Sequence, residues 1–307
     1  RDMTQTEIAF EKVSGGGNDF ICIDNRDGRF DDLLADTERV GHFARTLCRR
    51  GMGVGADGVI FACRNDMVEF ADIAARHYEA DGSEVELCGN GVGCFAAWVH
   101  ENRWLPPGEL RILTPAGVVR GRNSEGDYFR VCIPLPEDIR HDLAVPTDGK
   151  TWNCDFVVVG IPHVVTWVND LPKVDVARWG SQLRHHAMFQ PRGVNANFVE
   201  VLGPGQLAMR TFEFGVEGET LACGTGSAAC AILTALRENW SGGLTSGEEP
   251  ILIHCRGGDR LRVFVEIDDS GAIVDLCLET LIRRPYGGTV REELAAEALG
   301  RPRELAS

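Results

Sequence analysis

The feature that most constrains this chain is a short motif that occurs twice: a cysteine followed by glycine, a polar residue and glycine. The first copy begins at Cys88 (CGNG) and the second at Cys223 (CGTG), a little under half the chain further along. Each copy leads into an apolar run, so we expect a helix to begin at or just after each cysteine. The economical interpretation is two similar halves, each presenting a helix N-terminus that carries a cysteine.

The motif suits anion binding and proton transfer. Its glycines leave the first helical N–H groups uncovered, so that an anion can approach them. The same groups and the helix dipole favour a thiolate. If the halves face each other, both cysteines flank one anion, and the N–H groups around it belong to Gly89, Asn90, Gly224 and Thr225. The alternative is that the cysteines are small buried apolar residues, but such residues do not need this glycine pattern twice.

Composition excludes several classes of partner. The net charge of −15 argues against nucleic acid. The eleven cysteines include no CxxC pair and no Cys/His cluster with zinc spacing, so we expect no metal. The charged N-terminus lacks the apolar core of a signal peptide, and no apolar run is long enough to span a membrane. We therefore expect a cytoplasmic protein whose thiols stay reduced.

The remaining pattern predicts an α/β (α+β) protein with two domains. Residues 7–25 indicate a hairpin, because strand-like alternation flanks a run of glycines. A second hairpin is expected at 157–168, and helices at 37–48 and 174–185. Prolines 134 and 136 close a set of strands, and we place the boundary there. The domains are 1–133 and 134–279, with 280–307 returning to the first.

Several further motifs occur in the order seen in diaminopimelate epimerase. These are GGGNDF at 15–20, GxGAD at 53–57, Pro-His at 162–163, VNANF at 194–198 and Glu213, together with the two cysteine motifs. The chain resembles that family over roughly residues 7–280. The resemblance implies two similar halves related by a pseudo-twofold axis, each a curled mixed sheet around a central helix, with the active site in the cleft between them. Proline racemase is a more distant relative that shares the arrangement of two cysteines.

The resemblance also implies inversion of an amino-acid α-carbon without pyridoxal phosphate, metal or other cofactor. One cysteine must be a thiolate to take the α-proton, and the other a thiol to give one on the opposite face. His163 and Glu213 would adjust the protonation of the cysteines. Taken alone, they could be a turn histidine and a solvated strand end. The expected partner is a small amino-acid substrate, and a homodimer is left open.

The sequence departs from the family where the family holds the far end of its substrate. Asn18 and Asn195 remain. Gly58 stands where Gln is usual, Glu79 where Asn is usual, Ile161 where Asn is usual and Phe214 where Arg is usual. Replacing Arg by Phe removes a bidentate partner for a carboxylate. The chemistry at the α-carbon is therefore kept while the distal pocket differs.

These departures predict a basic or aromatic amino acid as substrate in place of diaminopimelate. Ile161 and Phe214 suit an apolar body, and Glu79 suits a terminal cation. Glu79 could equally be a turn residue that faces solvent. One alternative is a diaminopimelate epimerase, acting in lysine and peptidoglycan synthesis, with its pocket supported by other residues. Another class is an isomerase or dehydratase of the proline racemase-like fold that acts on a non-amino acid.

Overall fold

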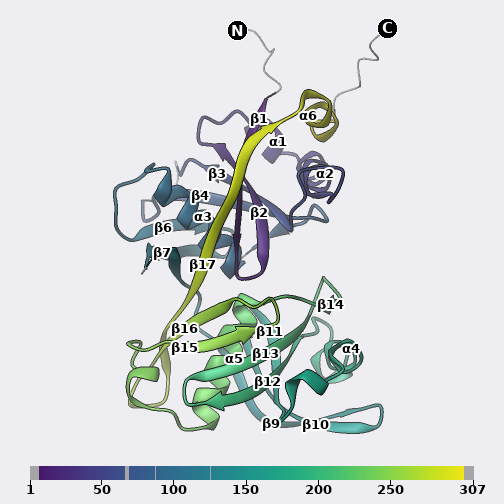
Figure 1. Cartoon of the computed structure of the whole chain (residues 1–307), viewed down its shortest axis with the longest axis vertical. Coiled ribbons are helices and arrows are strands. Elements are labelled where there is room, and N and C mark those ends of the chain that lie inside the picture. The colour runs from purple at the N-terminus through teal and green to yellow at the C-terminus, as the bar shows by residue number, and fades with distance from the viewer. Residues whose placement is uncertain (1–6, 66–68, 87, 125, 301–307) are drawn as a thin grey trace. The chain divides into compact units, whose positions relative to one another are not determined.

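The computed structural model of this chain describes residues 7–65, 69–86, 88–124 and 126–300. Residues 1–129 with 282–307 form one compact unit (unit 1), and residues 130–281 form another (unit 2) (Figure 1). The first six residues of the charged N-terminus and Leu87, directly before the first cysteine motif, lie outside the described residues.

Unit 1 is a mixed sheet wrapped around a buried helix. Its strands are β1 (Ile8–Gly15), β2 (Asn18–Asn25), β3 (Gly58–Cys63), β4 (Ile73–Glu79), β5 (Glu84–Val85), β6 (Leu110–Thr114) and β7 (Gly117–Asn123), and its helices are α1 (Asp31–Leu34), α2 (Thr37–Cys48), α3 (Gly89–Glu101) and α6 (Glu292–Ala298). Along the order β1-β2-β3-β4-β6-β7, neighbouring strands are alternately antiparallel and parallel. Because α3 packs against strands from both ends of this order, including β1, β2 and β7, the sheet curls around it.

Unit 2 has the same plan. Its strands are β9 (Glu137–Thr147), β10 (Lys150–Val159), β11 (Ile161–Trp167), β12 (Asn195–Gly203), β13 (Gln206–Glu213), β14 (Gly218–Glu219), β15 (Ile251–Cys255) and β16 (Arg260–Ile267), and its helices are α4 (Val176–Arg184), α5 (Gly224–Arg237) and the short 3₁₀ turns Leu171–Lys173, Ala187–Phe189 and Gly242–Leu244. The order β10-β11-β12-β13-β15-β16 repeats the strand directions of unit 1. Helix α5 packs against β10, β11 and β16, as α3 does against its own strands.

The repeat confirms the predicted fold of two similar halves, each a curled mixed sheet around a central helix. The central helices are almost entirely buried, which explains the apolar runs after the cysteines. Helices α2 and α4 cover the outer face of their sheets, where aromatic side chains such as Phe43 and Phe61 in unit 1 and Phe198 in unit 2 are fully buried. Burying each of these rings contributes about 2 kcal/mol.

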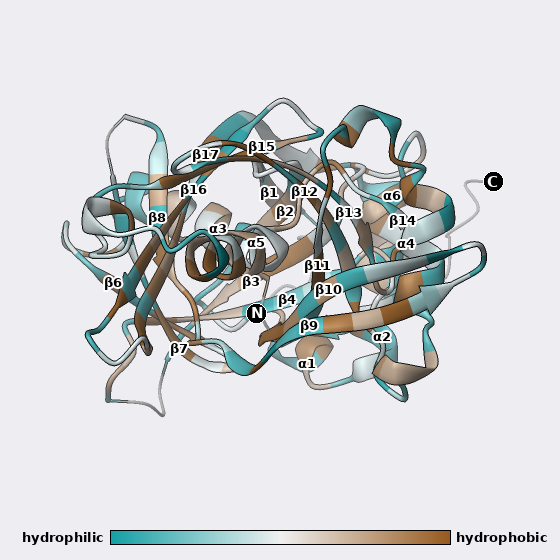
Figure 2. Cartoon of the chain, turned by 90° about the horizontal axis from the view of Figure 1, so that it is seen from below, coloured by the Kyte–Doolittle hydropathy of each residue, from teal (hydrophilic) through white to brown (hydrophobic). Residues whose placement is uncertain are grey.

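Two strands differ from the expectation. Strand β9 was not predicted, because most of its residues are exposed and its sequence lacks the alternation that marks a half-buried strand. Figure 2 shows mixed hydrophilic and hydrophobic colour along the β9–β10 hairpin. The last strand, β17 (Ile273–Val290), runs past residue 279, where the second domain was expected to end. Strand β17 continues past Gly287 and Gly288 and pairs with β1. Strand β8 (Tyr128–Cys132) pairs with β17 as well.

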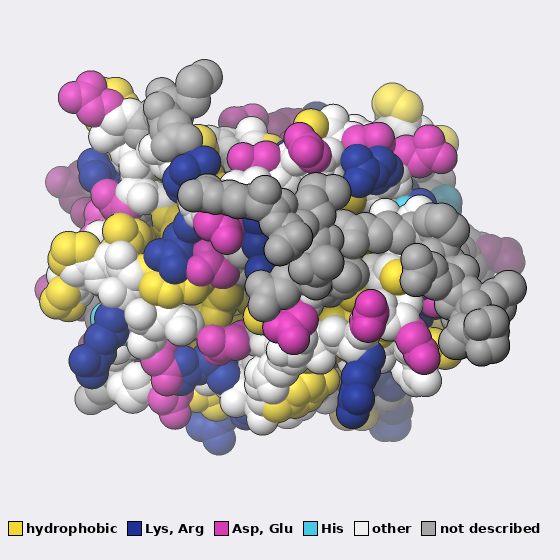
Figure 3. Space-filling view, turned by 90° about the horizontal axis from the view of Figure 1, so that it is seen from above, with side chains coloured by type: hydrophobic (Ala, Val, Ile, Leu, Met, Phe, Trp, Pro, Cys, Tyr) yellow, Lys and Arg dark blue, Asp and Glu magenta, His cyan; other side chains and the backbone are white. Residues whose placement is uncertain are grey.

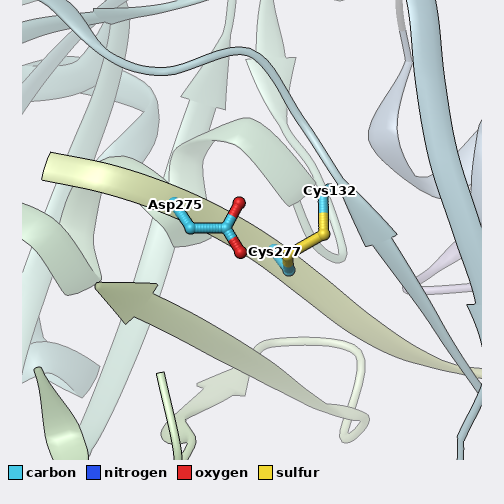
Figure 4. A group of neighbouring side chains, drawn as sticks. All are labelled: Cys132, Asp275 and Cys277. Atoms are coloured by element: carbon cyan, nitrogen blue, oxygen red, sulfur yellow. Dashed lines mark hydrogen bonds between the residues drawn. A yellow bond between two sulfur atoms is a disulfide. The ribbon is translucent and has the colours of Figure 1, made fainter. Parts of the chain in front are cut away.

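The expectation that all thiols stay reduced is wrong for one pair. Cys132 on β8 and Cys277 on β17 form a disulfide within unit 2 (Figure 4). Their α-carbons are only 3.9 Å apart, since the two strands lie side by side. The carboxylate of Asp275 lies beside them. In the disulfide, both sulfurs are bonded to each other, so this cluster offers no pair of thiolates to a metal ion.

On the face of the molecule that Figure 3 shows, acidic and basic side chains are interspersed, and neither sign forms a patch of its own. Many of the acidic groups have arginine partners, as in the pair of Arg111 with Asp72. Of the helices in the described parts of the chain, none has the length and hydropathy needed to cross a membrane.

Candidate active site

Each cysteine of the repeated motif caps the helix that follows it. Cys88 and Cys223 both adopt the extended backbone of an N-cap residue, with φ of −127° and −137°. Each sulfur accepts a hydrogen bond from the third residue of its helix, from Gly91 N at 3.4 Å and from Gly226 N at 3.3 Å. Neither helix carries an acidic residue in its first turn. A thiolate at either cap is therefore stabilised by N–H donors and by the helix dipole.

In unit 1 the glycine-rich turn and the first cysteine helix are joined by side-chain amides. Asn90 Nδ2 donates to Asn18 Oδ1 at 2.9 Å and to the carbonyl of Gly16 at 3.1 Å. Asn18 Nδ2 in turn donates to Asp57 Oδ2 at 3.1 Å, so the GGGNDF and GxGAD motifs meet. Gly16 has a φ of +60°, and a β-carbon there would lie 2.4 Å from Asn90 Oδ1. This approach requires glycine.

A charged cluster fixes the same loop, and the sequence did not indicate it. Lys12, which is buried, lies 2.8 Å from Asp19, while Arg50 bridges Asp19 and Asp57. Burial by itself raises the pKa of Asp19, but the bonds from Arg50 and Lys12 outweigh it and lower that pKa to about 2. Asp19 is thus ionised in the folded protein and holds both backbone segments that support Asn18.

In unit 2 the amide beside the cysteine is that of Asn195, at the start of β12. Its Nδ2 lies 3.8 Å from the sulfur of Cys223, and its Oδ1 accepts the backbone N–H of Phe214 at 2.8 Å. Thr225 Oγ1 lies 3.7 Å from the same sulfur. Glu213, next to Phe214, accepts a hydrogen bond from Thr220. The structure therefore brings Asn195 and Thr225 to Cys223, with Phe214 held through Asn195.

His163 lies on β11, one of the strands that pack against α5 in unit 2. It is 0% exposed, and its Nδ1 lies 3.3 Å from the amide nitrogen of Asn197, whose oxygen accepts from Thr211. Burial lowers the pKa of His163 to about 3, so the imidazole is neutral near pH 7. A β-carbon on Gly226 would meet Asn197 Oδ1 at 2.7 Å, which places this polar cluster directly against the first turn of α5. The turn-histidine alternative does not describe this environment.

The repeat gives Glu79 a counterpart. In unit 1, Gly58 at the start of β3 pairs with Glu79 at the end of β4. In unit 2, the pairing Ala196–Phe212 places Asn195, at the start of β12, opposite Glu213 at the end of β13. The two glutamates thus occupy the same position in the two halves. Glu79 is half-buried, as Glu213 is.

Two of the substituted pocket positions, Ile161 and Phe214, carry apolar side chains that are at least partly accessible. Phe214 is 45% exposed, and Val216 and Leu221 on the same segment are 63% and 52% exposed. The guanidinium of Arg184 lies 4.3 Å from the centre of the Phe214 ring and pairs with Glu217 at 3.1 Å. Ile161 is half-buried at the start of β11. A cation therefore lies near position 214, but a carboxylate of the chain already pairs with it.

Comparisons with known proteins identify the family of the chain. The sequence pattern of the diaminopimelate epimerase family matches residues 10–126 and 156–276. The chain is 35% identical to diaminopimelate epimerase of Aquifex aeolicus, over 94% of this chain and 99% of that protein. It is 36% identical to the enzyme of the same name from Chlorobaculum tepidum, over 91% and 99%.

Solved structures show the same fold at low identity. A PhzF-family phenazine biosynthesis protein of Bacillus anthracis superposes with a TM-score of 0.70 at 16% identity, covering 93% of this chain and 99% of that one. A hydroxyproline epimerase from Agrobacterium vitis gives 0.69 at 15% identity, covering 93% and 91%.

The repeated fold and its relatives define the class of this protein, an isomerase of the epimerase and racemase type. Within that class, the chain belongs to the diaminopimelate epimerase family.

Proposed function

We propose that this protein is a cofactor-independent amino-acid racemase or epimerase, with Cys88 and Cys223 as its two bases. The observation that carries the proposal is the matched pair of N-cap cysteines, each with a hydrogen bond from the third helical N–H. A single buried cysteine would have an ordinary explanation. Two cysteines at the same place in a repeated fold point to a shared role.

The reaction needs only proton transfers. The thiolate of one cysteine takes the α-proton of the substrate, and the electron pair of the broken C–H bond delocalises into the α-carboxylate. The N–H groups at the helix N-termini favour that charge as it develops. The thiol of the other cysteine then donates its proton to the opposite face of the α-carbon. The enzyme is left with the two protonation states exchanged, and the reverse reaction restores them.

The substrate we propose is a basic or aromatic amino acid. Three exposed apolar side chains, Phe214, Val216 and Leu221, precede Cys223 and offer contact to an apolar body. Arg184 is already paired with Glu217, so a distal carboxylate of the substrate would compete with that pair. Glu79, half-buried at the position equivalent to Glu213, would favour a cationic end.

A second candidate is diaminopimelate epimerase itself. It is favoured by the names of relatives that are about 35% identical over nearly the whole chain. Arg184 lies against Phe214 and could serve a distal carboxylate if Glu217 released it. Measuring kcat/KM for the common L-amino acids and for LL-diaminopimelate decides between the two. We expect a basic or aromatic amino acid to give the higher value.

The reaction type is tested by α-proton exchange. The protein is incubated with single amino acids in deuterated water, and loss of the α-proton signal is followed by NMR together with the D/L ratio. We expect Cys88→Ala and Cys223→Ala each to abolish inversion while keeping the circular dichroism spectrum. Full inversion in either variant would refute the two-base proposal. A wild type that exchanges no amino acid α-proton would favour the isomerase or dehydratase class.

The pocket argument has its own test in Phe214→Arg. Restoring a guanidinium should raise kcat/KM for LL-diaminopimelate by about ten-fold, the low end for a hydrogen bond to a charged group at a partly exposed site. Phe214→Leu is the matched control, since it changes the side chain without adding charge. If diaminopimelate is already the best substrate of the wild type, or if the Arg variant gains nothing over the Leu variant, the assignment of position 214 is wrong.

A further inference from the structure

His77, in the middle of β4, is a buried residue that neither the motifs nor the proposed reaction uses. It is 7% exposed, and within the described residues its Nε2 has no hydrogen-bond partner. Phe20 meets the imidazole edge-on, with ring centres 5.1 Å apart. An imidazole nitrogen buried without a partner is costly, so its presence calls for an explanation.

The imidazole and the first cysteine line one cavity. This cavity has a volume of about 20 Å³, room for about one water molecule, and Ile60, Val92 and Thr114 also line it. A β-carbon placed on Gly91 would lie 3.3 Å from His77 Nδ1 and 3.4 Å from the β-carbon of Cys88. The two side chains therefore approach the same residue of α3, the one whose N–H reaches the sulfur of Cys88.

The two halves carry their buried imidazoles on different strands. In unit 2, His163 on β11 pairs with Asn195, the first residue of β12. At the same register in unit 1, Phe20 on β2 pairs with Gly58. Unit 1 thus has no imidazole on that strand and carries one on β4 instead. Glycine at position 58 leaves room for this imidazole, because a β-carbon there would lie 2.6 Å from His77 Nε2.

We propose that His77 is a positioning residue for Cys88: it holds a hydrogen-bonding imidazole in the cavity behind the sulfur and favours the thiolate there. The proposal rests on the proposed function in giving Cys88 the role of a base. The comparable group in unit 2 is the polar cluster of His163, which lies against the first turn of α5 after Cys223.

Charge around the cavity is consistent with this role. Burial lowers the pKa of His77 to about 4, so the ring is neutral near pH 7 and offers one N–H donor and one acceptor. Glu86 also lines the cavity. From β2 and α3, Cys22 and Cys94 are titratable neighbours, and burial raises the pKa of both, so both remain thiols. Phe20, Ile60 and Thr114 carry no charge. The hydroxyl of Thr114, also in the lining, already donates to the carbonyl of Gly117, so the imidazole is the neutral polar group we assign to the sulfur.

The test is the pH dependence of alkylation at Cys88, measured by iodoacetamide labelling and peptide mass spectrometry on the full chain. Cys223 in the same sample is the internal control. In His77→Phe, the midpoint for Cys88 should move upward by about one pH unit, because an apolar ring removes the donor that favours the thiolate. His77→Gln keeps a donor and should move it less. His254→Phe, which removes another histidine with an unpartnered Nε2, but on β15, should not move it.

Two outcomes would overturn the proposal: an unchanged Cys88 midpoint in His77→Phe, or an equal shift at Cys223. If the Phe variant does not fold, His77→Ile supplies an apolar residue suited to a strand, with the same expectation. A merely structural role would lower the melting temperature without a shift confined to Cys88. Labelling needs no turnover, so a wild type without racemase activity would refute the proposed function and leave the coupling of His77 to Cys88 measurable.

Discussion

Acid should destabilise this protein well above the pH at which its carboxylates titrate. The cause is a pair of buried histidines, His77 in unit 1 and His163 in unit 2, whose pKa values burial lowers to about 4 and about 3. In the unfolded chain both return to about 6.5. Between these values the unfolded state binds more protons than the folded state. Stability is therefore complete above pH 6.5 and is lost as the pH falls toward the folded values.

The size of the loss follows from the same values. Between pH 7.5 and pH 5, each histidine stays neutral in the folded state and becomes almost fully protonated in the unfolded state. Proton linkage then removes about 2 kcal/mol per histidine, or about 4 kcal/mol for both. Carboxylates add little in this window. Asp19, for example, has a folded pKa of about 2 and an unfolded value near 4, so it acts at lower pH.

The assay is urea unfolding, followed by circular dichroism and tryptophan fluorescence at several pH values from 5 to 7.5. His77→Gln and His163→Gln should each shrink the loss between these limits by about 2 kcal/mol, whatever they do to stability at pH 7.5. If the units unfold in separate transitions, each transition should carry the effect of its own histidine. A wild type whose free energy of unfolding is flat over this range, or Gln variants that keep the whole loss, would refute the reasoning.

Two further predictions concern stability. Gly180→Ala should lower the free energy of unfolding by about 1–2 kcal/mol in the same urea assay, because the new β-carbon would lie 2.4 Å from the β-carbon of Phe212. This loss is expected although alanine favours helix more than glycine does. Gly203→Ala is the control: the space around Gly203 is open, so this variant should be neutral or slightly stabilising. Replacing Cys132 and Cys277 by serine should lower the stability of unit 2 by about 2–4 kcal/mol, and dithiothreitol should reproduce this in the wild type but leave the double variant unchanged.

The sequence predicted those parts of the fold whose local pattern matches their final environment. Helices α3 and α5 begin where the cysteine motifs placed them, because the cap, the glycines and the apolar run all favour the same start. Strand β9 lacks such agreement: it is largely polar and exposed, and its pairing with β10 and the burial of Val145 hold it in place. The extension of β17 past Gly287 likewise depends on pairing with β1, as in Ile8 with Val290, and no local window of the sequence contains both strands.

Likewise, some residues of the candidate site could be predicted from the sequence and others could not. Residues within motifs, such as Asn18, Asn195 and His163, could be found because their neighbours in sequence mark them. The Arg50 bridge to Asp19 and Asp57 could not, since it joins a loop to two separate turns. Such contacts arise from the register of the sheet, which a sequence specifies only through the burial pattern of whole strands.

His77 illustrates where a better signal was available. The alternation of Ile73, Ala75 and His77 places this histidine on the face that points into the protein, where a polar side chain is unusual. The family comparison drew attention only to Glu79, two residues further on. Comparing the two halves of this chain backwards from the cysteines, with a gap of one residue, identifies both residues: Glu79 as the counterpart of Glu213, and His77 as an imidazole on a different strand from His163. Because the halves share one fold and surround their cysteines with different side chains, the differences between them show which polar groups to test for an effect on each cysteine.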